Sequence, residues 1–156
     1  MRALLQRVSR ASVRVEDEQV AAIGPGLLVL LGVGHHDGES TTDELARRIV
    51  ELRMFPDEEG RTNRSILEVA GGILVVSQFT LYATTSKGRR PGFTDAAPAS
   101  LAERLYERLV RRFEDLGVSP VASGRFGASM AVELVNDGPF TLWLDTDAGT
   151  SAKSGT

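Results

Sequence analysis

The sequence predicts an α+β fold in which a mixed, curled β-sheet approaches a barrel and two helices pack on it. Segments with strand periodicity outnumber the two stretches with helical spacing, and the element order is β-β-β-β-α-β-α-β-β. A sheet with this many strands and so few helices tends to curl. With 156 residues and 42% hydrophobic content, we expect a single domain over residues 1–146.

The N-terminal part of the chain predicts four strands. Apolar and polar residues alternate over 1–8 and 11–16, which indicates two strands joined tightly. The same pattern continues over 19–23 up to the turn signal Gly24-Pro25-Gly26. The continuous apolar run over 27–33 predicts a central strand that is buried on both faces.

Two stretches predict helices. Thr41 with Glu44, and Ser100 with Glu103, have the spacing of capping boxes. Apolar residues follow each box at helical spacing, namely Leu45, Ile49 and Leu52 in the first stretch and Leu101, Leu105, Leu109, Phe113 and Leu116 in the second. We expect the first helix to end at Phe55-Pro56-Asp57 and the second at the natural C-terminal cap Gly117.

The other segments predict strands and loops. Residues 57–65 indicate a polar loop, and 73–79 a strand. Two further strands are expected over 128–135 and 140–145. The small, polar residues 147–156 predict a disordered tail.

The segment Asn136-Asp137-Gly138-Pro139-Phe140-Thr141 lies between the last two predicted strands. Asn-Asp-Gly favours a hairpin turn, because all three residues tolerate positive φ. Pro139 is unexpected there, because it removes a backbone donor where the next strand should begin to pair. Turn preferences favour a rigid turn; the alternative is a stiff pair of backbone carbonyls presented to a ligand.

The composition excludes several kinds of chemistry. The chain has no cysteine, which removes disulfides, thiolate metal sites and a cysteine nucleophile. Its only histidines, the adjacent His35 and His36, lie in a polar segment and are expected at the surface. We therefore expect no metal centre and no cofactor.

Charge and hydropathy restrict the partners. The net charge of −3 argues against a broad basic surface, although Lys87-Gly88-Arg89-Arg90 forms a local cationic run. This run is either a solvated surface loop or a contact site within 83–98, a loop long enough to be functional. No apolar run approaches the roughly 20 residues that span a bilayer, so we expect a cytoplasmic protein without a membrane partner.

Polar residues follow the apolar strand at Ser77-Gln78-Phe79-Thr80-Leu81. A strand end is a rigid place from which backbone donors and hydroxyls can face a substrate. Ser77 or Thr80 would need an adjacent base to act as a nucleophile, and only a histidine could supply it. No Gly-x-Ser-x-Gly elbow surrounds either hydroxyl, and an ordinary polar strand end is the simpler interpretation.

Several motifs occur together in one order, above all Ser-Gln-x-x-Leu and Asn-x-Gly-Pro-x-Thr. They belong to matching segments at residues 1–8, 24–33, 76–83, 87–91, 124–128 and 135–141. Through them the chain from Met1 to Thr146 resembles the bacterial D-aminoacyl-tRNA deacylases, which hydrolyse D-amino acids from tRNA. Gly92 departs from the family pattern, which has serine, and this affects local loop contacts only.

The resemblance implies a homodimer that acts on tRNA. Each of its two active sites would be completed in trans by Gly138 and Pro139 of the other subunit, joined by a cis peptide bond. Their carbonyl oxygens would hold the α-amino group of the substrate, and an L side chain would collide with the proline. A D-amino acid would pass, and so would glycine mischarged to tRNA.

The resemblance also implies the roles of other residues. Ser77, Gln78, Phe79 and Thr80 would form the catalytic segment, with backbone amides near Phe79 and Thr80 stabilising the carbonyl oxygen. The 2′-hydroxyl of the tRNA would assist the reaction, and Thr80 would position the substrate. The expected contacts with the terminal adenosine are Phe126, Met130 and Ala102; those with tRNA phosphates are Lys87, Arg89 and Arg90.

Two other functions stay open at this point. A non-catalytic protein could bind the 3′ end of tRNA through the same pocket. A serine or threonine esterase could use Ser77 or Thr80. We expect no DNA partner.

Overall fold

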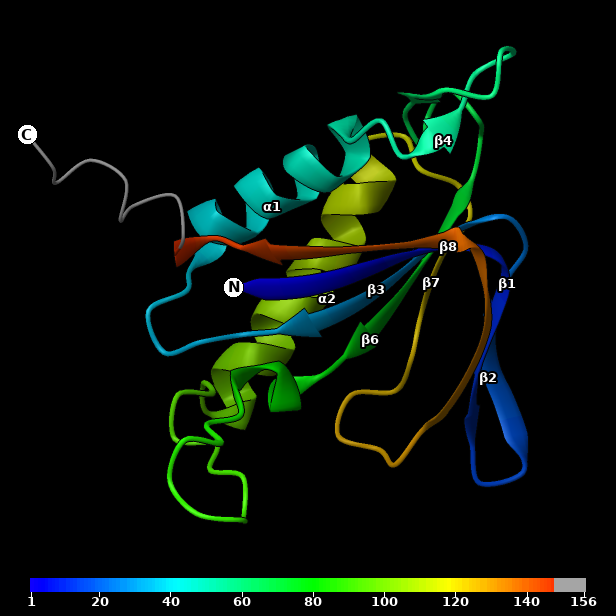
Figure 1. The fold of residues 1–156 in the computed structure, drawn as a ribbon. Coiled ribbons are helices and arrows are strands. Elements are labelled where there is room, and N and C mark those ends of the chain that lie inside the picture. Colours follow the sequence, from blue (N-terminus) through cyan, green and yellow to red (C-terminus); the bar gives the residue numbers. More distant parts are fainter. Residues whose placement is uncertain (148–156) are drawn as a thin grey trace, which may run out of the picture.

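A mixed six-stranded sheet forms the body of the molecule, and both helices pack on one of its faces (Figure 1). The computed structural model describes residues 1–147. In chain order the elements are β1 (Arg2–Val15), β2 (Glu18–Ile23), β3 (Gly26–Gly32), α1 (Glu39–Glu51), β4 (Phe55–Pro56), β5 (Thr62–Arg64), β6 (Gly72–Ser77), the 3-10 turn η1 (Phe79–Tyr82), α2 (Ala99–Asp115), β7 (Val121–Ser123) and β8 (Ala131–Asp145).

The main sheet has the strand order β2-β1-β3-β6-β7, and β8 pairs with the other edge of β1. β3, β6 and β7 run parallel to one another, whereas the pairs of β1 are antiparallel. The sheet is therefore mixed, and β1 and β8 bend together as it curls towards a barrel (Figure 1). The predicted fold class is confirmed.

Two hydrophobic clusters lie on opposite faces of the sheet. The larger one joins the helices to the sheet and contains Leu27, Val29 and Leu31 of β3. The second contains Leu28, with Leu30 packed against it. Because successive strand residues point to opposite faces, β3 is buried on both sides, as its continuous apolar run predicts.

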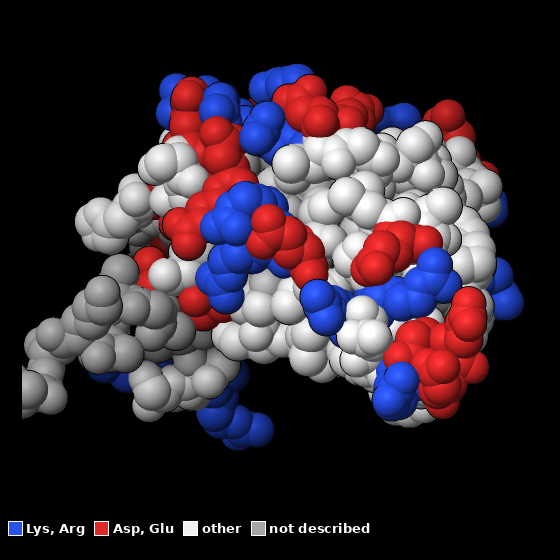
Figure 2. Space-filling model, turned by 90° about the horizontal axis from the view of Figure 1, so that it is seen from above, with Lys and Arg blue, Asp and Glu red and all other residues white. Residues whose placement is uncertain are grey.

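An ion-pair cluster links the two helices. The Arg108 guanidinium contacts Asp43 at 2.8 Å and Glu39 at 3.1 Å, and Arg112 contacts Asp43 at 3.3 Å. The hydrogen bond from Arg108 lowers the pKa of the Asp43 carboxyl. On the face seen from above in Figure 2, basic and acidic side chains are interspersed, so this face presents no broad basic surface.

The N-terminal strands are one continuous strand, which corrects the prediction of two. The first half of β1 pairs with β3 and its second half with β2. Ser9 and Arg10, between the two predicted strands, are exposed but carry no turn signal, so the chain continues in extended form.

Both predicted capping boxes are wrong. α1 begins after Gly38 and α2 after Pro98, and neither cap residue makes a side-chain hydrogen bond to its helix. In α1 the Thr42 hydroxyl donates instead to the carbonyl of Gly38 at 2.9 Å and faces the Met1 sulfur. The C-terminal cap of α2 is confirmed, because Gly117 follows it with φ of +94°.

α1 ends at Glu51, earlier than predicted, and the segment after it forms a hairpin. Phe55 of β4 pairs with Arg64 of β5, within what the sequence indicated as a helix end and a polar loop. The Asp57 carboxylate accepts hydrogen bonds from the amides of Glu59 and Arg61 and closes this turn.

The strand predicted over 73–79 is shorter, and β7, like β4 and β5, was missed. β6 ends at Ser77, and η1 curls the chain from Phe79 onwards. β7 has only three residues, too few for a clear period, and it pairs in parallel with β6. The loop over 83–98 is confirmed as free of helices and named strands.

The predicted hairpin at Asn136–Thr141 is wrong, because β8 runs through this segment as one strand. The chain bulges there, and its register against β1 shifts on either side of Val8. Asn136 closes the bulge, since its Oδ1 accepts from the amide of Phe140 at 2.9 Å and its Nδ2 donates to Thr141 at 2.8 Å. An asparagine side chain thus replaces the turn that the sequence suggested.

The amino group of Met1 is buried at the start of β1. It contacts the Asp37 carboxylate at 2.6 Å and also donates to the Thr146 hydroxyl. The same carboxylate accepts from the amide of Gly34 at 2.6 Å and from the Tyr82 hydroxyl at 3.4 Å. Asp37 therefore ties the chain start to the segment after β3 and to η1.

We expect Asp37→Asn to destabilise the protein by roughly 3 kcal/mol, because it leaves a buried charged group without its counter-charge. Urea unfolding followed by circular dichroism measures the loss. A matched control is Glu51→Gln, which removes an exposed pair with Arg47 and should cost under about 0.5 kcal/mol. Equal stabilities of the two variants would contradict the role of Asp37.

Within residues 1–147, no helix has the length and apolar character needed to cross a membrane. Of the tail predicted over 147–156, residues 148–156 lie outside the described residues.

Candidate active site

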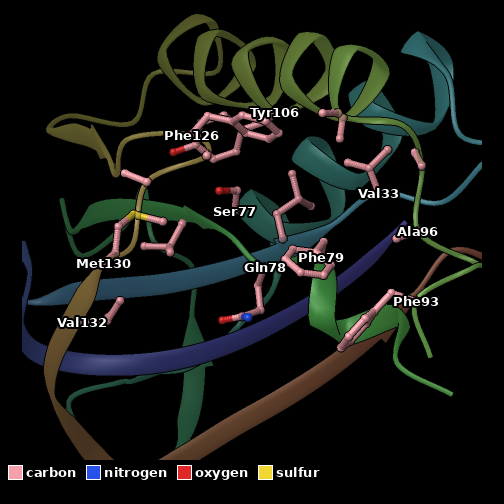
Figure 3. A pocket seen from close by; sticks show the side chains of 17 residues that line it. Val33, Ser77, Gln78, Phe79, Phe93, Ala96, Tyr106, Phe126, Met130 and Val132 are labelled. Atoms are coloured by element: carbon pink, nitrogen blue, oxygen red, sulfur yellow. The ribbon is translucent and has the colours of Figure 1, made fainter. Parts of the chain in front are cut away.

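A cavity of about 560 Å³ opens between α2, the ends of β3 and β6, and the loops before α2 and β8. Its lining is mostly apolar and contains no carboxylate, imidazole or cationic side chain among the described residues. Six of the residues predicted for the site meet here: Ser77, Gln78, Phe79, Ala102, Phe126 and Met130 (Figure 3).

The end of β6 brings the predicted catalytic segment, Ser77 to Thr80, to the edge of the cavity. The amide of Gln78 donates to Leu31 of β3 at 2.7 Å, which extends the parallel pairing one step beyond Ser77. The chain then turns into η1, whose first internal hydrogen bond runs from the amide of Leu81 to Gln78. The amides of Phe79 and Thr80 start this turn, so they have no partner within it.

Two contacts of Arg2 hold η1 in place. The Arg2 guanidinium donates to the carbonyl of Leu81 at 3.0 Å and lies over the Tyr82 ring at 4.4 Å. Gly34 makes room for that ring, because a Cβ there would lie 2.8 Å from the tyrosine hydroxyl oxygen. Burial raises the pKa of Tyr82, so the hydroxyl stays protonated.

Thr80 is exposed, and its hydroxyl oxygen accepts a hydrogen bond from the side-chain Nε2 of Gln78. This hydrogen bond does not activate the hydroxyl, because activation for attack needs a base that accepts its proton. Both histidines are exposed, as predicted, and His35 is engaged by the carbonyl of Thr94 at 2.7 Å. Within residues 1–147, neither Thr80 nor Ser77 contacts a basic side chain.

One end of the cavity is formed by Phe126, Tyr106 and Met130 (Figure 3). The Tyr106 hydroxyl donates to the carbonyl of Val75 at 2.9 Å, and burial raises its pKa to about 12. Its ring lies 5.8 Å from that of Phe126. The sequence did not single out Tyr106, because its position fits the buried face of a helix.

The other end carries an aromatic pair that the sequence also did not predict in full. Phe79 and Phe93 lie edge to face, with ring centroids 5.1 Å apart. Phe93 belongs to the long loop that length alone marked as functional. A single phenylalanine in a loop has no sequence pattern around it that would mark it as a site residue.

Gly138 and Pro139 are exposed on β8, and neither lines this cavity. Their peptide bond is cis, as the family resemblance implies. Arg7 supports the bulge from behind, since its Nε donates to the carbonyl of Asp137 at 3.0 Å and its guanidinium lies 4.8 Å from the Phe140 ring centre. The motif is therefore rigidly held but separate from the cavity of its own chain.

Lys87, Arg89 and Arg90 are exposed in the loop before α2. Two backbone hydrogen bonds between Thr84 and Gly92, of 2.8 and 2.9 Å, close this loop at its base. The three side chains lie outside the cavity lining, so their contact with phosphates stays a prediction.

Among the described residues, no group of three or more acidic or histidine side chains could hold a metal ion.

Known proteins resemble this chain over nearly its whole length. The profile of the D-Tyr-tRNA(Tyr) deacylase family matches residues 4–145. A D-aminoacyl-tRNA deacylase of Roseiflexus sp. is 57% identical, with 94% of each chain covered, and one of Ruegeria pomeroyi is 55% identical, with 93% and 99% covered.

Solved structures share the fold. A c-Myc DNA unwinding element binding protein superposes with a TM-score of 0.89 at 40% identity, covering 94% of this chain and 99% of that one. A probable eukaryotic D-amino acid tRNA deacylase has a TM-score of 0.80 at 20% identity, with 92% and 97% covered, and so shows the fold alone. In view of the first structure's name, the absence of a DNA partner stays a prediction.

Proposed function

The chain belongs to the D-Tyr-tRNA(Tyr) deacylase family and is a hydrolase of D-aminoacyl-tRNA, and we propose how its residues carry out this reaction. The observation that carries the proposal is the meeting of the β6–η1 segment with Phe126, Met130 and Ala102 around one cavity. A site built this way positions a nucleoside beside backbone amides.

The terminal adenosine binds at the Phe126 end. Its base packs against Phe126 and Met130, since aromatic and thioether groups suit a flat π-system. Ala102, at the start of α2, is small and leaves space for it. The apolar lining binds an uncharged nucleoside, and the charged phosphates stay outside the cavity.

The ester carbonyl lies at the start of η1. There the amides of Phe79 and Thr80 stabilise the negative charge that develops on the carbonyl oxygen, an effect worth several kcal/mol when donors are preorganised. Gln78 orients the hydroxyl of Thr80, which positions substrate or water. Ser77 lines the cavity beside this segment.

The bond changes of hydrolysis need no side-chain nucleophile. A water oxygen attacks the ester carbon, the bond from that carbon to the ribose oxygen breaks, and the ribose oxygen takes up a proton. The vicinal 2′-hydroxyl of the tRNA assists this transfer. The protein contributes position and electrostatics.

A second copy of the chain completes the site. Gly138 and Pro139 do not reach the cavity of their own chain, and they stand on β8, whose pairing partner among the described residues is β1 alone. Exposed Val135 and Trp143 on the same strand supply apolar surface for a subunit contact. We infer a homodimer in which each β8 presents its bulge to the partner's cavity.

The bulge selects the hand of the amino acid. The carbonyl oxygens of Gly138 and Pro139 accept from the α-ammonium group of the substrate, and an L side chain meets the proline ring. A D side chain points away, and glycine has no side chain to collide. Because backbone groups make the contact, many D-amino acids fit.

An assay with D-tyrosyl-, L-tyrosyl- and glycyl-tRNA tests this function. We expect release of D-tyrosine and glycine, whereas the L-ester decays at its spontaneous rate measured without protein. Equal cleavage of both tyrosyl esters would contradict chiral selection. Binding of the tRNA without any cleavage would instead indicate a non-catalytic protein.

A further inference from the structure

The aromatic pair at the second end of the cavity is unusually exposed. Phe79 has 57% of its surface exposed and Phe93 38%, although large aromatic side chains gain most from burial. Their rings meet at 72°, and an edge-to-face pair leaves at least one face of each ring uncovered by the other. Figure 3 shows the pair at the end of the cavity away from Met130.

The backbone around Phe93 is firmly held. The amide of Ala96 donates to the carbonyl of Phe93 at 3.1 Å, and the amide of Ala97 donates to Val33 at 2.9 Å. Neighbouring Thr94 is bonded to His35, and Gly92 is paired with Thr84. The backbone that carries the exposed ring is thus held on both sides, as a binding surface requires.

The same loop carries cations. Lys87, Arg89 and Arg90 are exposed three to six residues before Phe93, beyond the Thr84–Gly92 closure. An exposed aromatic ring in the same loop as exposed cations is a combination that proteins use for single-stranded nucleic acid, where bases stack and phosphates pair with arginine. The occupant that fits has a base for the ring and a phosphate for the loop.

We propose that Phe93 stacks on the base of the penultimate nucleotide of the tRNA 3′ end. This inference rests on the proposed function, which puts the last nucleoside at the Phe126 end. The strand then leaves the cavity past Phe79 and Phe93, and the phosphate between the last two nucleotides faces Arg89 and Arg90.

The test uses two forms of D-tyrosyl-tRNA, one normal and one with an abasic penultimate nucleotide. For the unaltered protein we expect kcat/KM to fall by about tenfold on the abasic form, because one base–aromatic stack is lost. For Phe93→Leu, kcat/KM on normal tRNA should be lower by a similar factor, and it should not fall further on the abasic tRNA. Phe93→Tyr keeps the ring and should behave as the unaltered protein.

The outcomes separate the two proposals. If the abasic nucleotide lowered kcat/KM of Phe93→Leu by the same factor as that of the unaltered protein, the stacking proposal would be wrong. Equal activity of the unaltered protein on both tRNAs would also contradict it. An effect of Phe93→Leu that differs between D-alanyl and D-tyrosyl esters would assign the ring to the amino acid instead. Failure of the proposed function would appear differently, as no D-selective cleavage of normal tRNA by the unaltered protein.

Discussion

Replacing Gly138 with alanine is expected to lower kcat/KM for D-tyrosyl-tRNA by about a hundredfold, the cost of moving a reacting group by about 1 Å. Gly138 has φ of +136°, and an added Cβ would lie 2.9 Å from the amide nitrogen of Phe140 and 3.0 Å from the Arg7 guanidinium. The bulge must therefore shift, and with it both carbonyl oxygens that we propose to face the substrate amine.

Gly60→Ala is the matched control. Gly60 also has positive φ, +77°, but an added Cβ there meets nothing within 4 Å, and it lies in the turn between β4 and β5. Gly60→Ala shares the cost of a side chain at positive φ but introduces no close contact, so it should keep its activity. Thermal unfolding of both variants separates folding from catalysis. Full activity of Gly138→Ala would show that the bulge is not part of the active site.

The second large effect is complementation between two inactive variants. Ala102→Trp fills the cavity, and Gly138→Ala displaces the backbone of the bulge. In a mixed dimer one site combines both defects, whereas the other combines an intact cavity with an intact bulge. We expect the purified mixed dimer to recover about half of the unaltered activity, because a two-fold dimer has two equivalent sites.

Co-expression with two different C-terminal tags yields the mixed dimer, since the amino group of Met1 is buried and an N-terminal tag would disturb it. Each variant dimer alone is the control and should show only residual activity. A mixed dimer no more active than these controls would place Gly138 and the cavity in the same chain. A monomer in solution would exclude the shared site altogether.

The sequence predicted the elements whose signal is local. The apolar run of β3 gave a doubly buried strand, and the spacing of Leu105, Leu109 and Phe113 gave α2, because burial follows periodicity. The predicted capping boxes failed because the helices begin before them, at Glu39 and Ala99, so Thr41 and Ser100 already lie inside the first turn. The contact of Thr42 with Met1, 41 positions away, is one that no pattern within the helix reveals.

The candidate site was likewise predicted only in part from the sequence. Motif resemblance placed Ser77, Phe126 and Met130 together, and they do line one cavity. Spacing alone misjudged Asn136, which looked like the start of a hairpin but closes a bulge with its side chain. Whether this segment forms a hairpin turn or a bulge depends on whether β8 continues along β1, and that pairing is a property of the whole sheet.

The absence of carboxylates, imidazoles and cations from the lining of the cavity, within the described part of the chain, bears on how this enzyme tolerates mutation. Where main-chain amides, main-chain carbonyls and the substrate's own hydroxyl do the work, most side-chain replacements leave the reacting groups in place. Activity is then lost mainly through changes that bend the backbone or occupy the cavity. On the proposed mechanism, selectivity for one hand of an amino acid follows from the path of the chain. Substitutions that preserve the backbone, the cavity and the subunit contact should leave it intact.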